Sequence, residues 1–116
     1  MNYFKSLYFV IAVMVTSTSG FASDETQAGW IAYHRNDYAT ALREFRVAAL
    51  RGEAEAQWRL GLMYATGRGV TKDETLAVTW FRKSAEQGDA RGQFLMAHMY
   101  QRGLGVKQDE STAASW

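Results

Sequence analysis

Apolar and small residues recur at helical spacing in two adjacent blocks of the chain. Within 53–66 they follow one another at intervals of three and four, which places them on one side of an α-helix. The positions on that side are Ala54, Gln57, Leu60, Gly61, Met63 and Tyr64. The block 72–87 repeats the spacing with Leu76, Ala77, Trp80, Phe81, Ser84 and Ala85. The pattern predicts two consecutive helices, called helix A and helix B, each with one apolar face.

A glycine-containing loop separates these two helices. Gly67 is expected to end helix A, because glycine adopts the left-handed conformation of a helix C-cap at little cost. Gly69 allows a second change of direction. Thr71 and Glu74 have the spacing of a capping box, which predicts that helix B begins at Lys72.

The whole pattern returns 36 residues later. When 49–80 is aligned with 85–116, identical residues stand at 13 of 32 positions, against about two expected by chance. A period of this length is typical of a solenoid, in which each unit covers the apolar face of its neighbour. The residues that we assign to the structural signature of the repeat are Gly52, Ala54, Tyr64, Gly67, Gly69, Ala77, Trp80, Gly88, Ala90, Tyr100, Gly103, Gly105, Ala113 and Trp116.

A more divergent unit precedes these two. Residues 37–49 match residues 73–85 at Asp37, Ala41, Phe45, Arg46 and Ala49. Helix A of this opening unit is predicted at 28–35, with Tyr33 in the place of Tyr64. Its glycine loop is missing, and Asn36 is expected to make the turn, since asparagine tolerates left-handed geometry.

The predicted fold is therefore all-α: an α/α solenoid of stacked antiparallel helix pairs, about two and a half units long. The units are a tetratricopeptide-like opening unit at 27–50, a first repeat at 51–86 and a second, truncated repeat at 87–116.

The segment AEAQWRLGLMYATGRGVTKDETLAVTWFRKSAEQGDA resembles the Sel1-like repeat, a relative of the tetratricopeptide repeat with an extended glycine loop. The resemblance extends over 28–116. It implies a non-enzymatic adaptor or scaffold that binds other proteins on a concave helical surface. Two features depart from the family pattern: Ala97 replaces a usual glycine, and the sequence stops at Trp116 within a helix. Both a short natural protein and a truncated piece of a longer array are compatible with that end.

The first 22 residues have the composition of a secretory signal peptide. An apolar run at 7–15 is followed by small and polar residues, with Gly20 and Ala22 in a small-x-small arrangement that predicts cleavage before Ser23. A retained anchor is the alternative, although the run is shorter than the ~20 residues that span a bilayer. The chain has no cysteine, which excludes a lipoprotein anchor and favours the bacterial periplasm or exterior over a disulfide-rich secreted module. We expect no membrane association after cleavage.

Known catalytic and cofactor patterns are absent from the sequence. His34 and His98 lack the spacing of metal ligands, and no nucleophile motif is present. Lys and Arg number 13 and Asp and Glu number 12, so no strong basic field favours nucleic acid. We expect no metal, no cofactor and no enzymatic activity. The alternative is a cell-wall-related enzyme or enzyme inhibitor, as in a β-lactam-linked branch of the family, but that branch is rich in cysteine.

Positions that change between the units while sharing one face of helix A are the candidates for partner binding. They combine aromatic side chains with arginines, which suits contact with a protein or peptide. The candidate residues are Arg35, Trp58, Arg59, Leu62, Phe94, Leu95, His98 and Arg102. The alternative is structural: the aromatic residues pack against the preceding helix B and the arginines are simply solvated.

The C-terminal end supplies a second candidate surface. Its apolar residues would meet a following unit if one were present. They are Met96, Met99, Tyr100, Val106, Ala113 and Trp116. We therefore expect this end to bind another protein or a second copy of the chain.

Overall fold

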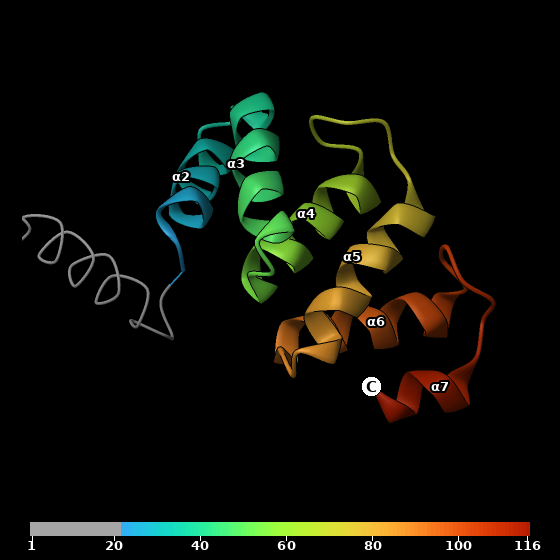
Figure 1. Ribbon diagram of the computed structural model, residues 1–116. Helices are drawn as coiled ribbons and strands as arrows, with labels where there is room; N and C mark the ends of the chain where they lie inside the picture. The colour runs from blue at the N-terminus through green and yellow to red at the C-terminus, as the bar shows by residue number, and fades with distance from the viewer. Residues whose placement is uncertain (1–21) are drawn as a thin grey trace, which may run out of the picture.

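The computed structural model describes residues 22–116 (Figure 1). Nearly all of the predicted signal peptide lies outside these described residues. The described helices are α2 (Asp24–His34), α3 (Tyr38–Leu50), α4 (Ala54–Thr66), α5 (Glu74–Glu86), α6 (Ala90–Arg102) and α7 (Glu110–Ser115). Over 22–116 the chain contains helices and no strand.

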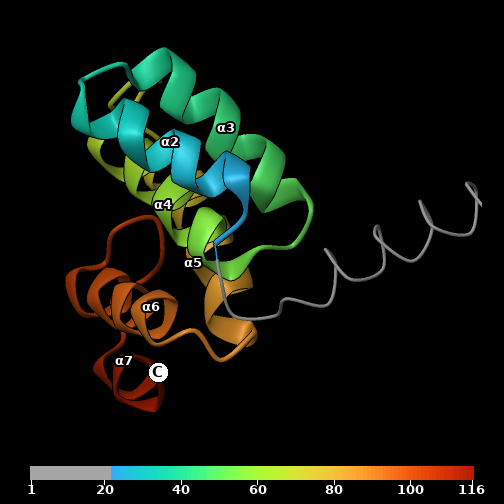
Figure 2. The same ribbon diagram turned by 90° about the vertical axis from the view of Figure 1, so that its left-hand side faces the viewer.

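The helices form a row of antiparallel pairs. Each helix packs against the next one along the chain, and α4 also packs against α6 (Figures 1 and 2). The helices α2, α4 and α6 are the A helices of the three units, and α3, α5 and α7 are the B helices. The prediction of an all-α solenoid of helix pairs is confirmed.

Two apolar clusters hold the row together. The first is centred on Phe45, Leu60 and Met63, at the junction of α3 and α4, and the second on Phe81 and Met96, at the junction of α5 and α6. These five side chains are almost completely buried. The apolar face of one unit is thus covered by the next, as the repeat period predicts.

Small residues on the A helices let the B helices come close. A Cβ atom on Gly61 would lie only 2.5 Å from the ring of Phe81, and one on Gly29 only 2.6 Å from the ring of Phe45. In these two pairs the ring of the B helix therefore rests directly on the backbone of its paired A helix. This contact fixes the register of the two helices.

The loops between A and B helices turn where the sequence predicts. Gly67 and Gly103 follow α4 and α6 with φ of 70° and 64°, in the left-handed region that glycine favours. Asn36 takes the same conformation in the opening unit, with φ of 61°. In both longer loops a backbone hydrogen bond joins the start of helix B to helix A: Asp73 N donates to Tyr64 O at 2.9 Å, and Asp109 N to Tyr100 O at 3.0 Å.

The other signature residues have mixed surroundings. Ala77 and Ala113 are buried, Trp80 and Trp116 are half-buried, and Ala90 is exposed. The remaining ones are Ala54, which is half-buried, and Gly52, Gly69, Gly88 and Gly105, all with positive φ.

Two predicted helix starts are wrong. Helix α2 begins at Asp24 rather than at residue 28, because the Ser23 hydroxyl accepts a hydrogen bond from Thr26 N and caps it there. Helix α5 begins at Glu74 rather than at Lys72. Its cap is the Asp73 carboxylate, which accepts from Leu76 N at 3.0 Å, so the predicted capping box does not form.

The predicted register of the opening unit is also wrong by one residue. Gly29 faces Phe45 as Gly61 faces Phe81, so α2 corresponds to α4 with an offset of 32 residues, whereas the alignment of Tyr33 with Tyr64 implies 31. Tyr64 therefore corresponds to Ala32 and not to Tyr33. The offset of 32 is four residues shorter than the 36-residue period of the two repeats, because the α2–α3 loop is four residues shorter than the α4–α5 loop.

Candidate functional site

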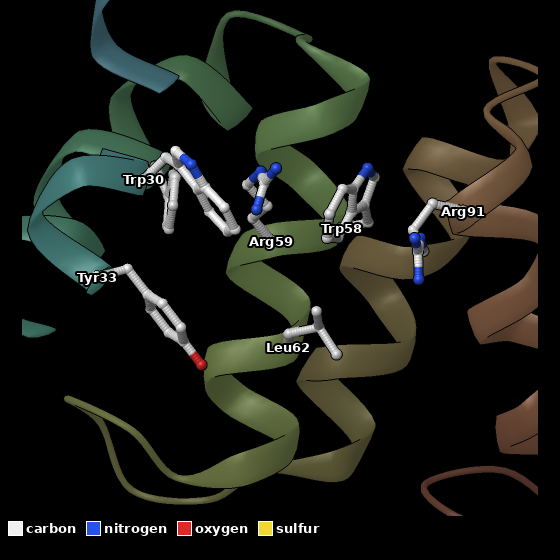
Figure 3. A pocket seen from close by; sticks show the side chains of 7 residues that line it. Trp30, Tyr33, Trp58, Arg59, Leu62 and Arg91 are labelled. Atoms are coloured by element: carbon white, nitrogen blue, oxygen red, sulfur yellow. The ribbon is translucent and has the colours of Figure 1, made fainter. Parts of the chain in front are cut away.

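Tryptophan and arginine side chains alternate across the A helices. The guanidinium of Arg59 on α4 lies 4.0 Å from the ring centroid of Trp30 on α2 and 4.4 Å from that of Trp58 (Figure 3). On the far side of Trp58, the guanidinium of Arg91 on α6 lies 5.6 Å from the same ring. At the near end, the His34 ring meets Trp30 edge-on at 3.7 Å. These residues form a continuous row, called the Trp–Arg stack, that joins all three units.

Arg59 is the fixed centre of the stack. Its Nε and Nη2 atoms donate to Glu55 Oε1 at 3.0 and 2.8 Å, one helical turn earlier. The side chain is only 16% exposed. A cation held between two aromatic faces interacts favourably with both, at about 0.5–1 kcal/mol each near a surface. Glu55 thus orients the guanidinium that keeps Trp30 and Trp58 apart.

A groove of about 300 Å³ lies beside the stack. Its lining residues are Trp30, Tyr33, Phe45, Trp58, Arg59, Leu62 and Arg91. Trp30 is 43% exposed although it lies against neighbouring side chains. Tyr33 is held at this groove by Arg68 of the α4–α5 loop, which donates to the Tyr33 hydroxyl at 2.5 Å. That hydrogen bond raises the pKa of Arg68 above its ordinary value, so the cation is retained.

A second groove, of about 370 Å³, lies between α4 and α6. It is lined by Leu62, Ala65, Thr66, Lys72, Glu74, Phe81, Phe94, Leu95, His98, Met99 and Leu104. Phe94 is 63% exposed at this groove. Lys72 and Glu74 pair with each other at 3.3 Å. Leu62 lines both grooves, so the two form one apolar track along the A helices.

Six of the eight predicted binding residues line this track. Trp58, Arg59 and Leu62 lie at the first groove, and Leu62, Phe94, Leu95 and His98 at the second. Leu95 lines the second groove but is only 9% exposed and belongs to the core between α5 and α6, so it forms the wall of the groove rather than an open contact.

Arg35 and Arg102 do not line either groove. Both are exposed at the C-terminal ends of their A helices, Arg35 as the cap of α2 and Arg102 as the last residue of α6.

The first groove is also lined by Trp30, Tyr33 and Arg91. Arg91 lies on the variable face of helix A that the sequence indicates but is absent from the list of eight candidates, and Trp30 and Tyr33 were missed. With the corrected offset of 32 residues, Trp30 takes the place of Leu62, which was already a candidate. The register error in the opening unit concealed that equivalence. A search for large aromatic residues at every Leu62-equivalent position would have found Trp30.

The described residues contain no cluster of three or more His, Cys, Asp or Glu side chains placed to bind a metal ion. Among the same residues, no helix combines the length and apolar character needed to cross a bilayer.

The Sel1 repeat family matches the chain at residues 54–89 and 90–116. The chain belongs to the Sel1 repeat family. Both matched segments begin with an A helix, so the first Sel1 repeat contributes Trp58 and Arg59 to the stack and the second contributes Arg91. Trp30 comes from the opening unit, which precedes the matched segments.

Similar proteins have the same architecture. A Sel1 repeat protein from Oxalobacter formigenes superimposes with a TM-score of 0.78 at 32% identity, over 90% of this chain and 83% of that one. The protective antigen c5321 of uropathogenic Escherichia coli strains, which displays an SLR fold, gives a TM-score of 0.78 at 38% identity, over 84% of this chain and 21% of the antigen.

One curated relative is a component of a larger assembly. The ERAD-associated E3 ubiquitin-protein ligase component HRD3 of Candida glabrata is 44% identical over 50 residues, which are 43% of this chain and 6% of HRD3. The chain thus spans a small fraction of this relative. Sel1 repeats are protein–protein interaction modules and are typically non-enzymatic.

Proposed function

We propose that this Sel1 repeat protein is an exported, non-enzymatic interaction module that docks a segment of a partner protein along its A helices. The observation that carries this proposal is the continuous track of two grooves, which meet at Leu62 and are bordered by the Trp–Arg stack. Tryptophan, tyrosine and arginine dominate the energetics of protein interfaces, because they combine large contact areas with hydrogen-bonding groups.

The dimensions of the track suit side chains of a polypeptide. Each groove lies at the lower end of the ~300–1,000 Å³ range of small-molecule sites. An extended segment could place one apolar side chain beside Leu62 and Trp30 and a second beside Phe94. The exposed aromatic surface of Trp30 and Phe94 would be covered by such a segment.

Charge on the track favours a partner with an acidic group. Glu55 neutralises Arg59 and Glu74 neutralises Lys72, whereas Arg91 has no carboxylate within 4.0 Å among the residues that the structure describes. A partner carboxylate could therefore pair with Arg91 without competing with an existing ion pair. The partner segment that fits best combines apolar side chains with at least one carboxylate.

Site-specific photo-crosslinking in the producing cell tests this function. A photoreactive phenylalanine analogue at Phe94 keeps an aromatic ring on the track. The same analogue at Leu50, which is 71% exposed on α3 and lines neither groove, is the matched control. We expect a discrete protein adduct from position 94 that is absent from position 50 and is weakened by Arg91→Glu. Adducts of equal strength at both positions, or adducts at position 50 alone, would contradict docking on the A helices.

A further inference from the structure

The backbone nitrogen of Ser23 is bound to a carboxylate far away in the sequence. Ser23 N–H donates to Glu53 Oε1 at 2.8 Å, across 30 residues. The Ser23 hydroxyl caps α2 by accepting from Thr26 N at 3.2 Å. Ser23 therefore joins the start of α2 to the α3–α4 connection, where Glu53 precedes α4. Both the N–H group and the hydroxyl of Ser23 thus form hydrogen bonds with residues that follow it in the sequence.

The surroundings of this nitrogen are rich in negative charge. Asp24 and Glu25 follow it in the first turn of α2, and Glu53 faces it from the α3–α4 connection. Arg51 pairs with Glu25 at 2.7 Å. Among the described residues, Glu53 has no Lys or Arg within 4.0 Å and its carboxylate accepts from a neutral amide. The Ser23 N–H group thus faces the carboxylate of Glu53, and two further acidic residues follow it in the sequence, of which Glu25 is paired with Arg51.

We propose that the chain is processed at the Ala22–Ser23 bond and that the new α-amino group forms an ion pair with Glu53. This inference rests on the export proposed above. A leader-cleaving endopeptidase would hydrolyse the bond: the C–N bond breaks, the oxygen of water joins the Ala22 carbonyl as a carboxylate, and the Ser23 nitrogen becomes an ammonium group. The nitrogen that now donates to Glu53 is the same atom that would carry the charge.

Cleavage strengthens this contact without moving it. A hydrogen bond between an ammonium and a carboxylate is stronger than one between an amide and a carboxylate. The dipole of α2 disfavours a positive charge at its N-terminus, but Asp24, Glu25 and Glu53 oppose that effect. The hydrogen bond from Gln27 Nε2 to Ala22 O at 3.0 Å is lost, and it is solvent-exposed. Removal of the leader therefore leaves the cap of α2 in place and adds an ion pair between two units.

The first test is the intact mass of the full-length chain after expression with its leader in a bacterial host. We expect a product that begins at Ser23. A product that keeps the leader overturns both export and this inference, and a product that begins at another residue overturns this inference alone.

The second test measures the pKa of the α-amino group on the processed protein, by the pH dependence of its reaction with an amine-selective reagent. We expect a pKa about one unit above the ordinary 7.7–8.0, and a return to the ordinary range in Glu53→Gln. Glu86→Gln, which changes an exposed carboxylate on α5, is the matched control and should leave the pKa raised.

The thermal stability of the processed protein gives an independent readout. Because the folded-state pKa is raised, the stabilisation is present below the unfolded pKa and is lost as the pH rises through the folded value. The difference in Tm between wild type and Glu53→Gln should therefore shrink from pH 7 to pH 10. Selective acetylation of the α-amino group removes its charge, so it should abolish the same pH-dependent gain in Tm without any substitution. A product that begins at Ser23 but whose amino pKa is ordinary and insensitive to Glu53 would overturn the ion pair and leave export standing.

Discussion

Arg82 donates a hydrogen bond to the hydroxyl of Tyr100 at 3.0 Å and so connects α5 of one unit to α6 of the next. The same bond occurs 36 residues earlier, from Arg46 to Tyr64 at 2.9 Å. Both tyrosines are half-buried. Their identity in the two repeats therefore reflects a polar connection between neighbouring units as well as apolar packing.

Tyr100→Phe should lower the free energy of unfolding by about 0.5–1.5 kcal/mol, because it removes one partly buried hydrogen bond and keeps the ring. Urea unfolding monitored by circular dichroism measures this loss. A double-mutant cycle with Arg82→Met should show that the two effects are coupled. Additive effects would indicate that the bond contributes nothing to stability.

Gly61→Ala should be destabilising by about 1–3 kcal/mol, since the new methyl group would overlap the Phe81 ring. The natural control is the equivalent position of the second repeat, where Ala97 already carries a methyl group. Ala97→Gly should cost only the ~0.5–1 kcal/mol of glycine in a helix. Thermal unfolding of both variants distinguishes the effect of packing against Phe81 from that of helix propensity. If Gly61→Ala raises Tm, the added methyl group does not clash with Phe81 and helix propensity dominates.

Arg59→Met should lower stability by about 1–2 kcal/mol, through the loss of two ring contacts, and it leaves Glu55 without its partner. Arg91→Met is the control within the same stack, because its guanidinium approaches one ring only, at 5.6 Å. We expect a smaller loss for that variant in denaturant titrations. Equal losses would argue against a special role for the arginine between the two indoles.

Charge reversal at Arg59 is consequently a poor probe of partner binding. A glutamate there would face Glu55 across one helical turn and would disturb the fold as well as the surface. Arg91→Glu and Arg102→Glu change exposed positions on α6, where binding can be altered at constant helical content.

The stability of the opening unit should fall in acid through the cap of α3. The hydroxyl and the backbone N–H of Thr40 donate to Asp37 and hold the pKa of that carboxyl below its ordinary value. A lowered folded-state pKa gives stabilisation that is present above the unfolded pKa of about 3.9 and is lost as the pH falls through the folded value. Asp37→Asn keeps a capping oxygen but cannot titrate. The difference in Tm between the two proteins should shrink progressively as the pH falls below about 3.9, and a difference that stays constant as the pH is lowered from 7 through this range would contradict this role.

The sequence predicts the array well because its signals are local and repeated. Glycines after each longer A helix and a fixed 36-residue period determine where the helices end and how the units stack. The opening unit is less predictable, because its shorter loop shifts the register and the repeat offers no second copy for comparison. The contact between Gly29 and Phe45, which restores the correct register, is visible only in three dimensions.

The candidate surface was only partly predictable for a different reason. Variable positions on one helix face indicate where recognition is possible, and Trp58, Arg59 and Phe94, selected in this way, line the two grooves. Whether such a residue is open or buried depends on the crossing of neighbouring helices. Leu95 shares its helix face with His98, yet it is covered by the packing between α5 and α6.

One wall of the first groove is supplied by α2, and that helix lies before residue 54, where the family match begins. A fragment cut at the family boundary would carry Trp58 and Arg59 but lack the indole on the other side of the guanidinium. If a partner docks at this groove as proposed, its recognition requires both the divergent opening helix pair and the first Sel1 repeat. Two proteins with interchangeable Sel1 repeats could in this way differ in what they select, by differing only in the hairpin that comes first.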